Sequence, residues 1–135
     1  MTYTRPIRIE FNHCDPAGIV FYPRYFEMTN SVVENFFREI AGWPYEEMMA
    51  AGTGVPTAQI QTVFHAPSRL GEVLDWRLSL VRLGSSSASL HIEAHGAGIH
   101  RLTCDLTLVF VNENGRPQPW PQAVRTKLIA FQEAT

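Results

Sequence analysis

The sequence predicts an α+β fold in which a five-stranded antiparallel sheet packs against one long helix. Apolar residues recur every three and four positions in residues 23–41, and they alternate with period two in three segments after residue 54. A helix with one apolar stripe and a sheet with one apolar face each need a cover. Packing the one on the other is therefore the simplest architecture.

The long helix is expected over residues 23–41. Pro23 suits the first helical turn, Gly42 suits the exit, and Pro44 follows just beyond. A second, short helix is expected over residues 45–51. The apolar face of the long helix is formed by Tyr25, Met28, Val32, Val33, Phe36, Phe37 and Ile40.

Strands are expected before and after the long helix in the sequence. Turn-forming segments rich in Gly, Asn and Ser join the last three strands into an antiparallel meander. A final helix is expected over residues 122–131, after a proline-rich stretch. The five expected strands are residues 5–11, 57–66, 74–80, 88–95 and 102–110.

Composition excludes several classes of protein. The 135 residues, 45% hydrophobic and 18% charged, are expected to form a single domain, residues 1–135, without room for two cores. A net charge of -2 without a basic run gives no reason to expect nucleic acid as a partner. Neither a membrane-spanning run nor an amino-terminal apolar signal region is recognisable, so we expect a cytoplasmic protein with no membrane role.

The segment CDPAGIVFYP, residues 14–23, leads from the first expected strand directly into the long helix. Its four consecutive apolar and aromatic residues, 19–22, predict a turn that is buried rather than a surface loop. The amino terminus of a helix presents unpaired backbone N–H groups and the positive end of its dipole. A carboxylate beside such donors, here Asp15, is the pairing that acyl transfer requires.

The decapeptide resembles the signature of the 4-hydroxybenzoyl-coenzyme A thioesterase family, within the hotdog-fold superfamily of acyl-coenzyme A thioesterases. The order of expected elements also agrees with that family as far as about Val111. The resemblance implies a sheet wrapped around the helix, homodimers that often pair into homotetramers, and active sites at the dimer interface. It implies hydrolysis of an acyl-CoA without a cofactor, since coenzyme A is part of the substrate.

Carried over by position, the family's catalytic aspartate is Asp15, and its carbonyl-polarising backbone N–H at the helix start falls on or near Tyr22. The carboxylate acts either as a nucleophile, through a mixed anhydride, or as a general base for water. Without the resemblance, Asp15 before Pro16 is equally well explained as a turn former.

Further residues are candidates for substrate binding. His13 stands where relatives often have an acidic residue, and strand alternation up to Asp15 would point both side chains the same way. Arg125 and Lys127 are additional candidates near the coenzyme A phosphates. The expected substrate-binding residues are His13, Gly18, Thr57, Arg82, Ser86 and Ser87.

The acyl group is expected to be aromatic, with a short aliphatic or acyl-carrier-protein thioester as the alternative. A non-catalytic hotdog module that binds an acyl thioester or a protein partner is the alternative function, although such a binder needs no carboxylate at Asp15. No metal site is expected, because His91 and His95 on one strand are about 13 Å apart. Cys104 is expected in the core.

Overall fold

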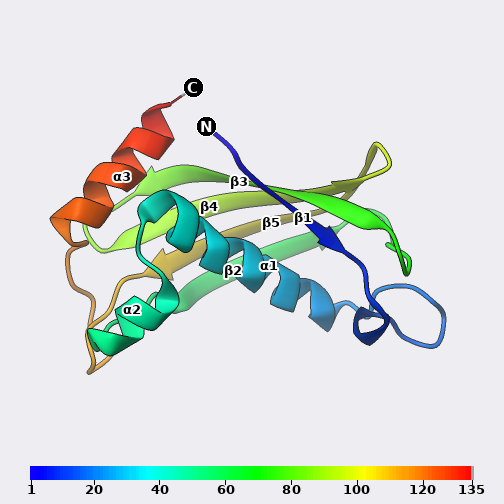
Figure 1. The fold of residues 1–135 in the computed structure, drawn as a ribbon, viewed down its shortest axis with the longest axis horizontal. Helices are drawn as coiled ribbons and strands as arrows, with labels where there is room; N and C mark the ends of the chain where they lie inside the picture. Colours follow the sequence, from blue (N-terminus) through cyan, green and yellow to red (C-terminus); the bar gives the residue numbers. More distant parts are fainter. Residues whose placement is uncertain (135) are drawn as a thin grey trace.

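The computed structural model describes residues 1–134. Its five strands form one antiparallel sheet in the order β1-β3-β4-β5-β2, and the long helix α1 lies across one face of that sheet (Figure 1). The strands are β1 (Tyr3–Arg8), β2 (Thr57–Phe64), β3 (Val73–Leu83), β4 (Ser87–Gly96) and β5 (Ile99–Val109). The helices are α1 (Pro23–Phe36), α2 (Tyr45–Ala50) and α3 (Gln122–Glu133), with a 3-10 helix Phe11–His13 and a π-helical turn Phe37–Ala41.

The long helix begins and ends where the sequence predicts, although its last turn widens into the π-helical turn. Pro23 occupies the first helical position, and Gly42 ends the helix with a φ of 68°, a left-handed conformation that favours glycine. The predicted second and third helices are also confirmed, with ends that differ by at most two residues. Among residues 1–134, no helix combines the length and apolarity that crossing a membrane requires.

The core lies between α1 and the inner face of β3, β4 and β5, as the alternation predicts. Cys104 is fully buried there, which confirms its expected place in the core. Burial of this apolar surface is the main driving force for the sheet to curve around the helix. Large buried side chains include Val32, Val33 and Phe36 on the helix, and Leu74, Trp76, Leu78, Leu90, Ile92, Leu102 and Leu108 on the strands.

The first strand is shorter than predicted. β1 ends at Arg8, and Phe11–His13 forms a 3-10 turn in place of the strand end. The turn is closed by hydrogen bonds between Glu10 and His13, in which the Nδ1 of His13 accepts the N–H of Glu10 at 2.8 Å. The alternation that would have aligned His13 with Asp15 is therefore interrupted.

Strand β2 forms one edge of the sheet and is largely exposed in the single chain. Its exposed side chains include Ile60, Val63 and Phe64, each between 43% and 47% exposed. A long exposed edge strand with apolar side chains is prone to pair with another strand. This edge bears on the oligomeric state proposed below.

Candidate active site

The segment around Asp15 folds back on itself before α1. The N–H of Asp15 donates to the carbonyl of Ile19 at 3.0 Å, and the N–H of Phe21 donates to the carbonyl of His13 at 2.9 Å. The tip is a turn in which the N–H of Gly18 donates to the carbonyl of Asp15 at 2.9 Å. Gly18 has a φ of +81°, so its place in this turn is explained by backbone conformation. This turn places Asp15 beyond the amino terminus of α1.

The carboxylate of Asp15 is half-buried and held against its own turn. Its Oδ1 accepts the N–H of Ala17 at 2.9 Å, the bond of an Asx turn. Its Oδ2 has no hydrogen-bond partner among residues 1–134. One carboxylate oxygen is thus oriented by the backbone, and the other is free to meet a substrate or a water molecule.

The turn is not buried within the single chain, contrary to the sequence-based prediction. Phe21 and Tyr22 are 49% and 59% exposed, and Pro16, Ala17 and Gly18 are also exposed. The reason is visible in Figure 1, where the loop before α1 extends past the end of the sheet and of the helix. Phe21 and Tyr22 therefore form an uncovered apolar surface of this loop, whereas Val20 is buried.

Tyr22 supplies a free donor at the start of α1. It adopts helical angles directly before Pro23, and its carbonyl accepts the N–H of Tyr25 at 3.1 Å. Its own backbone N–H has no acceptor among residues 1–134. An unpaired N–H at the positive end of a helix is a donor suited to a developing oxyanion.

The side chains around this donor are aromatic. The ring of Tyr22 contacts Phe21 and Phe64 with centroid distances of 5.8 and 6.0 Å, and Phe64 lies 5.6 Å from Tyr25. Tyr22, Tyr25 and Phe64 line an open cavity of about 490 Å³ between the start of α1 and the end of β2. Burial raises the pKa of the Tyr25 hydroxyl above its usual range.

A second cavity of about 410 Å³ lies between α1 and the strands β2 and β5. Thr57, at the start of β2, lines it together with Phe26, Asn30, Ile60 and Leu106. Thr57 thus lines a pocket, but that pocket is lined by neither Asp15 nor Tyr22, and the substrate-binding role of Thr57 stays a prediction.

His13 does not contact Asp15 as the alternation would allow. Its Nδ1 is occupied by the backbone of Glu10, which fixes the ring beside β1. His13 lines a shallow polar depression of about 370 Å³ with Arg5, Arg8 and Glu10.

Arg82, Ser86 and Ser87 lie at the opposite end of the sheet from the Asp15 turn. Arg82 lies near the end of β3, Ser86 in the turn that follows, and Ser87 at the start of β4. In the same turn, the carbonyl of Gly84 accepts a hydrogen bond from Arg125 of α3 at 2.9 Å. Within one chain the structure does not bring these three residues to Asp15. Sequence pattern alone could not show this, because it gave no distance between loops on opposite ends of the sheet.

The contacts of a buried arginine that hold the segment next to the site could not be predicted from the sequence. Arg101, which is 3% exposed, donates to the carbonyl of Pro67 at 2.9 Å and forms an ion pair with Glu72. The carbonyl of the adjacent Ser68 accepts the N–H of Val20 at 2.9 Å, which ties the Asp15 loop to this segment. The single signal in the sequence is a charged residue at the beginning of an apolar strand.

Comparison with known proteins identifies the family. The family model described as "Thioesterase-like superfamily" matches residues 9–128. A curated 4-hydroxybenzoyl-CoA thioesterase from Pseudomonas sp. (strain CBS-3) is 30% identical over 69 residues, which are 50% of this chain and 49% of that protein. The chain thus spans about half the length of this curated relative.

Solved structures share the fold across nearly the whole chain. A gentisyl-coenzyme A thioesterase superposes with a TM-score of 0.86 and 26% identity, over 93% of this chain and 99% of that one. A 1,4-dihydroxy-2-naphthoyl-CoA thioesterase from Synechocystis gives 0.89 and 17% identity, over 98% and 99%. A Staphylococcus aureus protein solved with CoA gives 0.92 and 16%, over 98% and 85%. The chain has the hotdog fold and belongs to the thioesterase-like superfamily.

Proposed function

We propose that this protein is an acyl-CoA thioesterase that hydrolyses an aromatic acyl-CoA to the free acid and coenzyme A. The observation that carries the proposal is the turn before α1, in which the Ala17 N–H holds one oxygen of the Asp15 carboxylate while the Tyr22 N–H at the start of α1 has no acceptor among residues 1–134. Family membership supports the reaction type. The names of three relatives, which are thioesterases for hydroxybenzoyl, gentisyl and dihydroxynaphthoyl groups, support an aromatic acyl group.

Two routes of hydrolysis fit this arrangement. In one, Asp15 accepts a proton from water while the oxygen of that water adds to the thioester carbon. In the other, the carboxylate adds directly, the C–S bond breaks, and water then hydrolyses the mixed anhydride. In both, the carbonyl oxygen gains negative charge that the Tyr22 N–H stabilises, and the coenzyme A thiolate leaves and takes up a proton.

The aromatic lining supports the choice of acyl group. An aryl ring in the cavity of Tyr22, Tyr25 and Phe64 would meet ring faces and edges, an arrangement worth about 0.5–1.5 kcal/mol per pair beyond the buried area. A short aliphatic or acyl-carrier-protein thioester remains the alternative substrate, because it would undergo the same chemistry at Asp15.

We also propose a homodimer, formed through the edge strand β2, that can pair further into a homotetramer. Two copies of one strand related by a two-fold axis across the sheet run antiparallel. The Thr57 end of β2 in one chain would then lie beside the Phe64 end of the other. This brings the cavity at Thr57 toward the Tyr22 region of the neighbouring chain and covers the exposed loop around Asp15.

The cytoplasmic location remains a prediction.

The test is thiol release from a panel of aryl and aliphatic coenzyme A thioesters. We expect activity on at least one aryl thioester, and a loss of at least about a hundredfold in turnover for Asp15→Asn. Asp75→Asn is the matched control, because Asp75 is an exposed carboxylate on β3 paired with Arg77. Unchanged turnover in Asp15→Asn would remove the mechanism, and no activity across the panel would favour a non-catalytic binding module.

A further inference from the structure

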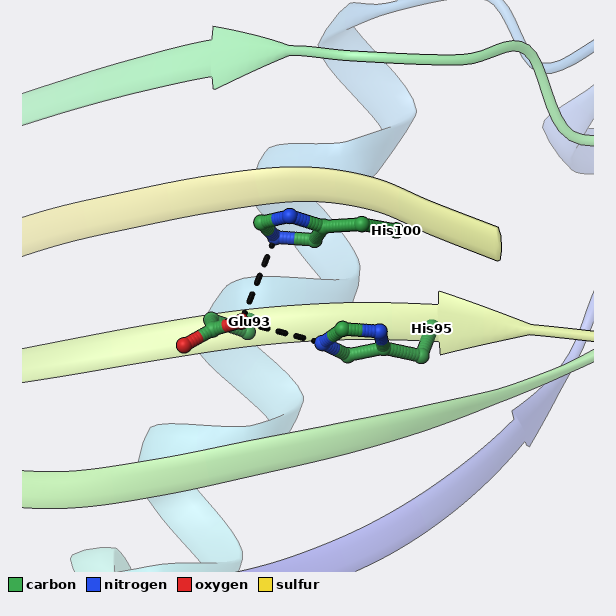
Figure 2. A group of neighbouring side chains, drawn as sticks. All are labelled: Glu93, His95 and His100. Carbon is green, nitrogen blue, oxygen red and sulfur yellow. Dashed lines mark hydrogen bonds and ion pairs between the residues drawn. The ribbon is translucent and has the colours of Figure 1, made fainter. Parts of the chain in front are cut away.

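Four of the five histidines of the sequence gather on the outer face of the sheet, away from the face that α1 covers. His65 comes from the segment just after β2, His91 and His95 from β4, and His100 from β5. Figure 2 shows His95 and His100 on the side of the strands opposite the helix, with Glu93 beside both rings and joined to each by a dashed line. None of these side chains acts on the thioester in the proposed chemistry, although His65 also lines the cavity of Tyr22.

Strand geometry explains only part of this cluster. Residues two apart on a strand share a face, so His91, Glu93 and His95 project together from β4. The expectation of no metal site was based on His91 and His95 of β4 alone. It took account neither of the carboxylate of Glu93, which stands between these two residues in the sequence, nor of the neighbouring strand β5.

A β-bulge supplies the second histidine. Up to Ala94, β4 and β5 pair in one register, with Ala94 opposite Leu102, but the next pair is His95 with His100. The shift leaves Arg101 as the extra residue, and Arg101 turns into the interior toward Glu72. Without the bulge, Arg101 would stand opposite His95. Bulges commonly re-aim a side chain in this way.

The three side chains are spaced as metal ligands. The Oε1 of Glu93 lies 2.9 Å from the Nε2 of His95 and 3.4 Å from the Nε2 of His100. One ligand atom from each of the three residues lies within 4.8 Å of the others. A tetrahedral ion with ligands at about 2.0–2.2 Å needs ligand atoms about 3.4 Å apart. The two imidazoles stack with centroids 4.5 Å apart, and binding of a shared ion requires both rings to tilt from this arrangement.

A second layer of contacts orients the carboxylate. His91 donates from Nε2 to the other oxygen of Glu93, Oε2, at 3.0 Å, and its Nδ1 lies 2.7 Å from Asp105 Oδ1. Such outer contacts typically fix the orientation of ligands in metal sites.

We propose that Glu93, His95 and His100 form a binding site for a divalent transition metal such as Zn²⁺, Co²⁺ or Ni²⁺. Two imidazoles and one carboxylate suit these ions better than Mg²⁺ or Ca²⁺, which prefer oxygen ligands. In the free protein the Nε2 of His100 lies 2.9 Å from the carbonyl of Leu102 and donates a hydrogen bond to it. On binding, each ligating Nε2 gives up its proton, the ring carries its remaining proton on Nδ1, and any excess proton passes to solvent.

The site would join β4 to β5 close to the hairpin turn Ala97–Gly98. The ring of His65 lies 4.4 Å from that of His100, and His65 also lines the cavity of Tyr22. A metal at this place would therefore stiffen the wall of that cavity without touching Asp15. The side chains of Glu93, His95 and His100 are 35%, 24% and 35% exposed, which leaves room for water to complete the coordination.

The experiment is a titration of tag-free protein with Co²⁺, followed by visible absorption, and with Zn²⁺, followed by calorimetry. We expect saturable binding of one ion per chain, and a loss of at least about a hundredfold in affinity for His95→Gln and for His100→Gln. His91→Gln is expected to weaken binding by about 10–100-fold through the carboxylate it orients. His13→Gln is the matched control, because it removes a histidine that caps a 3-10 helix remote from the cluster, and its affinity should equal that of the wild type.

Thermal unfolding gives a second readout, in which the comparison of Zn²⁺ with Mg²⁺ on the wild type does not depend on how the variants fold. Zn²⁺ should raise the unfolding temperature of the wild type, Mg²⁺ at the same concentration should not, and both variants should lose the Zn²⁺ effect. Equal Co²⁺ affinity in the wild type and the His95 and His100 variants would overturn the site. Absence of saturable Co²⁺ and Zn²⁺ binding by the wild type would do so as well. Neither result bears on the thioesterase proposal, which rests on other residues.

Discussion

Arg101 forms a two-point ion pair with Glu72. Its Nη2 lies 2.7 Å from Glu72 Oε2, and its Nη1 lies 3.0 Å from Glu72 Oε1. The guanidinium, which is almost fully buried, also donates to the carbonyls of Pro67 and Gly96. A buried cation with these partners fixes the segment to which the Asp15 loop is bonded, so the stability of the fold and the position of the candidate site depend on the same contact.

Replacing Glu72 by Gln should be strongly destabilising. The change leaves the Arg101 charge buried without its counter-ion, and breaking one partner of a buried pair costs about 3–5 kcal/mol. Because the two carbonyl acceptors of Arg101 remain, we expect about 3 kcal/mol of lost unfolding free energy, the lower end of that range. The measurement is urea denaturation followed by circular dichroism.

The control for this variant is Asp75→Asn. It breaks the Asp75–Arg77 ion pair, whose side chains are 46% and 48% exposed, and exposed pairs contribute less than about 1 kcal/mol. Similar losses of unfolding free energy in the two variants would mean that the buried pair of Arg101 and Glu72 is no more stabilising than an exposed pair.

The lowered pKa of Glu72 predicts that the free energy of unfolding depends on pH in the acidic range. The hydrogen bonds from Arg101 lower its pKa from the ordinary 4.5 to about 2. A carboxyl whose pKa is depressed in the folded state stabilises that state above its unfolded pKa, and the contribution is lost as the pH falls toward the folded pKa. The difference in unfolding free energy between wild type and Glu72→Gln should therefore shrink between about pH 5 and pH 2. A difference that stays constant across this range would contradict the assignment.

Most of the fold could be predicted because its periodicities are local. Alternation in β3 and β4 and the three-four repeat of α1 each reflect one buried face of one element, which neighbouring residues reveal. The 3-10 turn at Phe11–His13 could not be predicted this way. It depends on hydrogen bonds between Glu10 and His13 that interrupt an apparent strand.

The same distinction applies to the candidate site: relations within one short segment could be predicted, and contacts between distant segments could not. Asp15 and Tyr22 are seven positions apart in one short segment, so their relation to α1 could be inferred from order alone. The Arg101–Glu72 pair joins residues 29 apart, and the pairing of His95 with His100 depends on a one-residue bulge. A register shift leaves no mark in the sequence pattern, because both registers keep the same alternating residues on each strand up to the bulge.

The role of Tyr22 can be separated into its backbone and its side chain. If its N–H polarises the thioester carbonyl, Tyr22→Pro should lower turnover by about 10²–10³, the effect of losing one oxyanion donor. The φ of Tyr22 is -53°, which proline can adopt. Turnover is measured by thiol release at saturating substrate.

Tyr22→Ala is the matched control, because it removes the same ring contacts with Phe21 and Phe64 and keeps the N–H. We expect it to raise KM for an aryl thioester and to retain most of the turnover. Equal turnover in the alanine and proline variants would assign the effect to the ring and exclude the backbone donor. Thermal unfolding of both variants checks that the start of α1 remains folded.

The edge strand β2 predicts a dimer that can be broken by one charge. Val63 on this edge is 47% exposed. Val63→Lys would place two ammonium groups, one from each chain, in the two-fold interface, where they would be buried and would repel each other. We therefore expect this variant to be monomeric. Val81→Lys is the control, because Val81 on β3 is 62% exposed and lies away from the β2 edge. Sedimentation equilibrium measures the mass. Because the proposed interface also covers the Asp15 loop, thiol release should fall with dimer content in the Val63 variant and stay at the wild-type level in the Val81 variant. A fully active monomer would show that one chain holds the complete site.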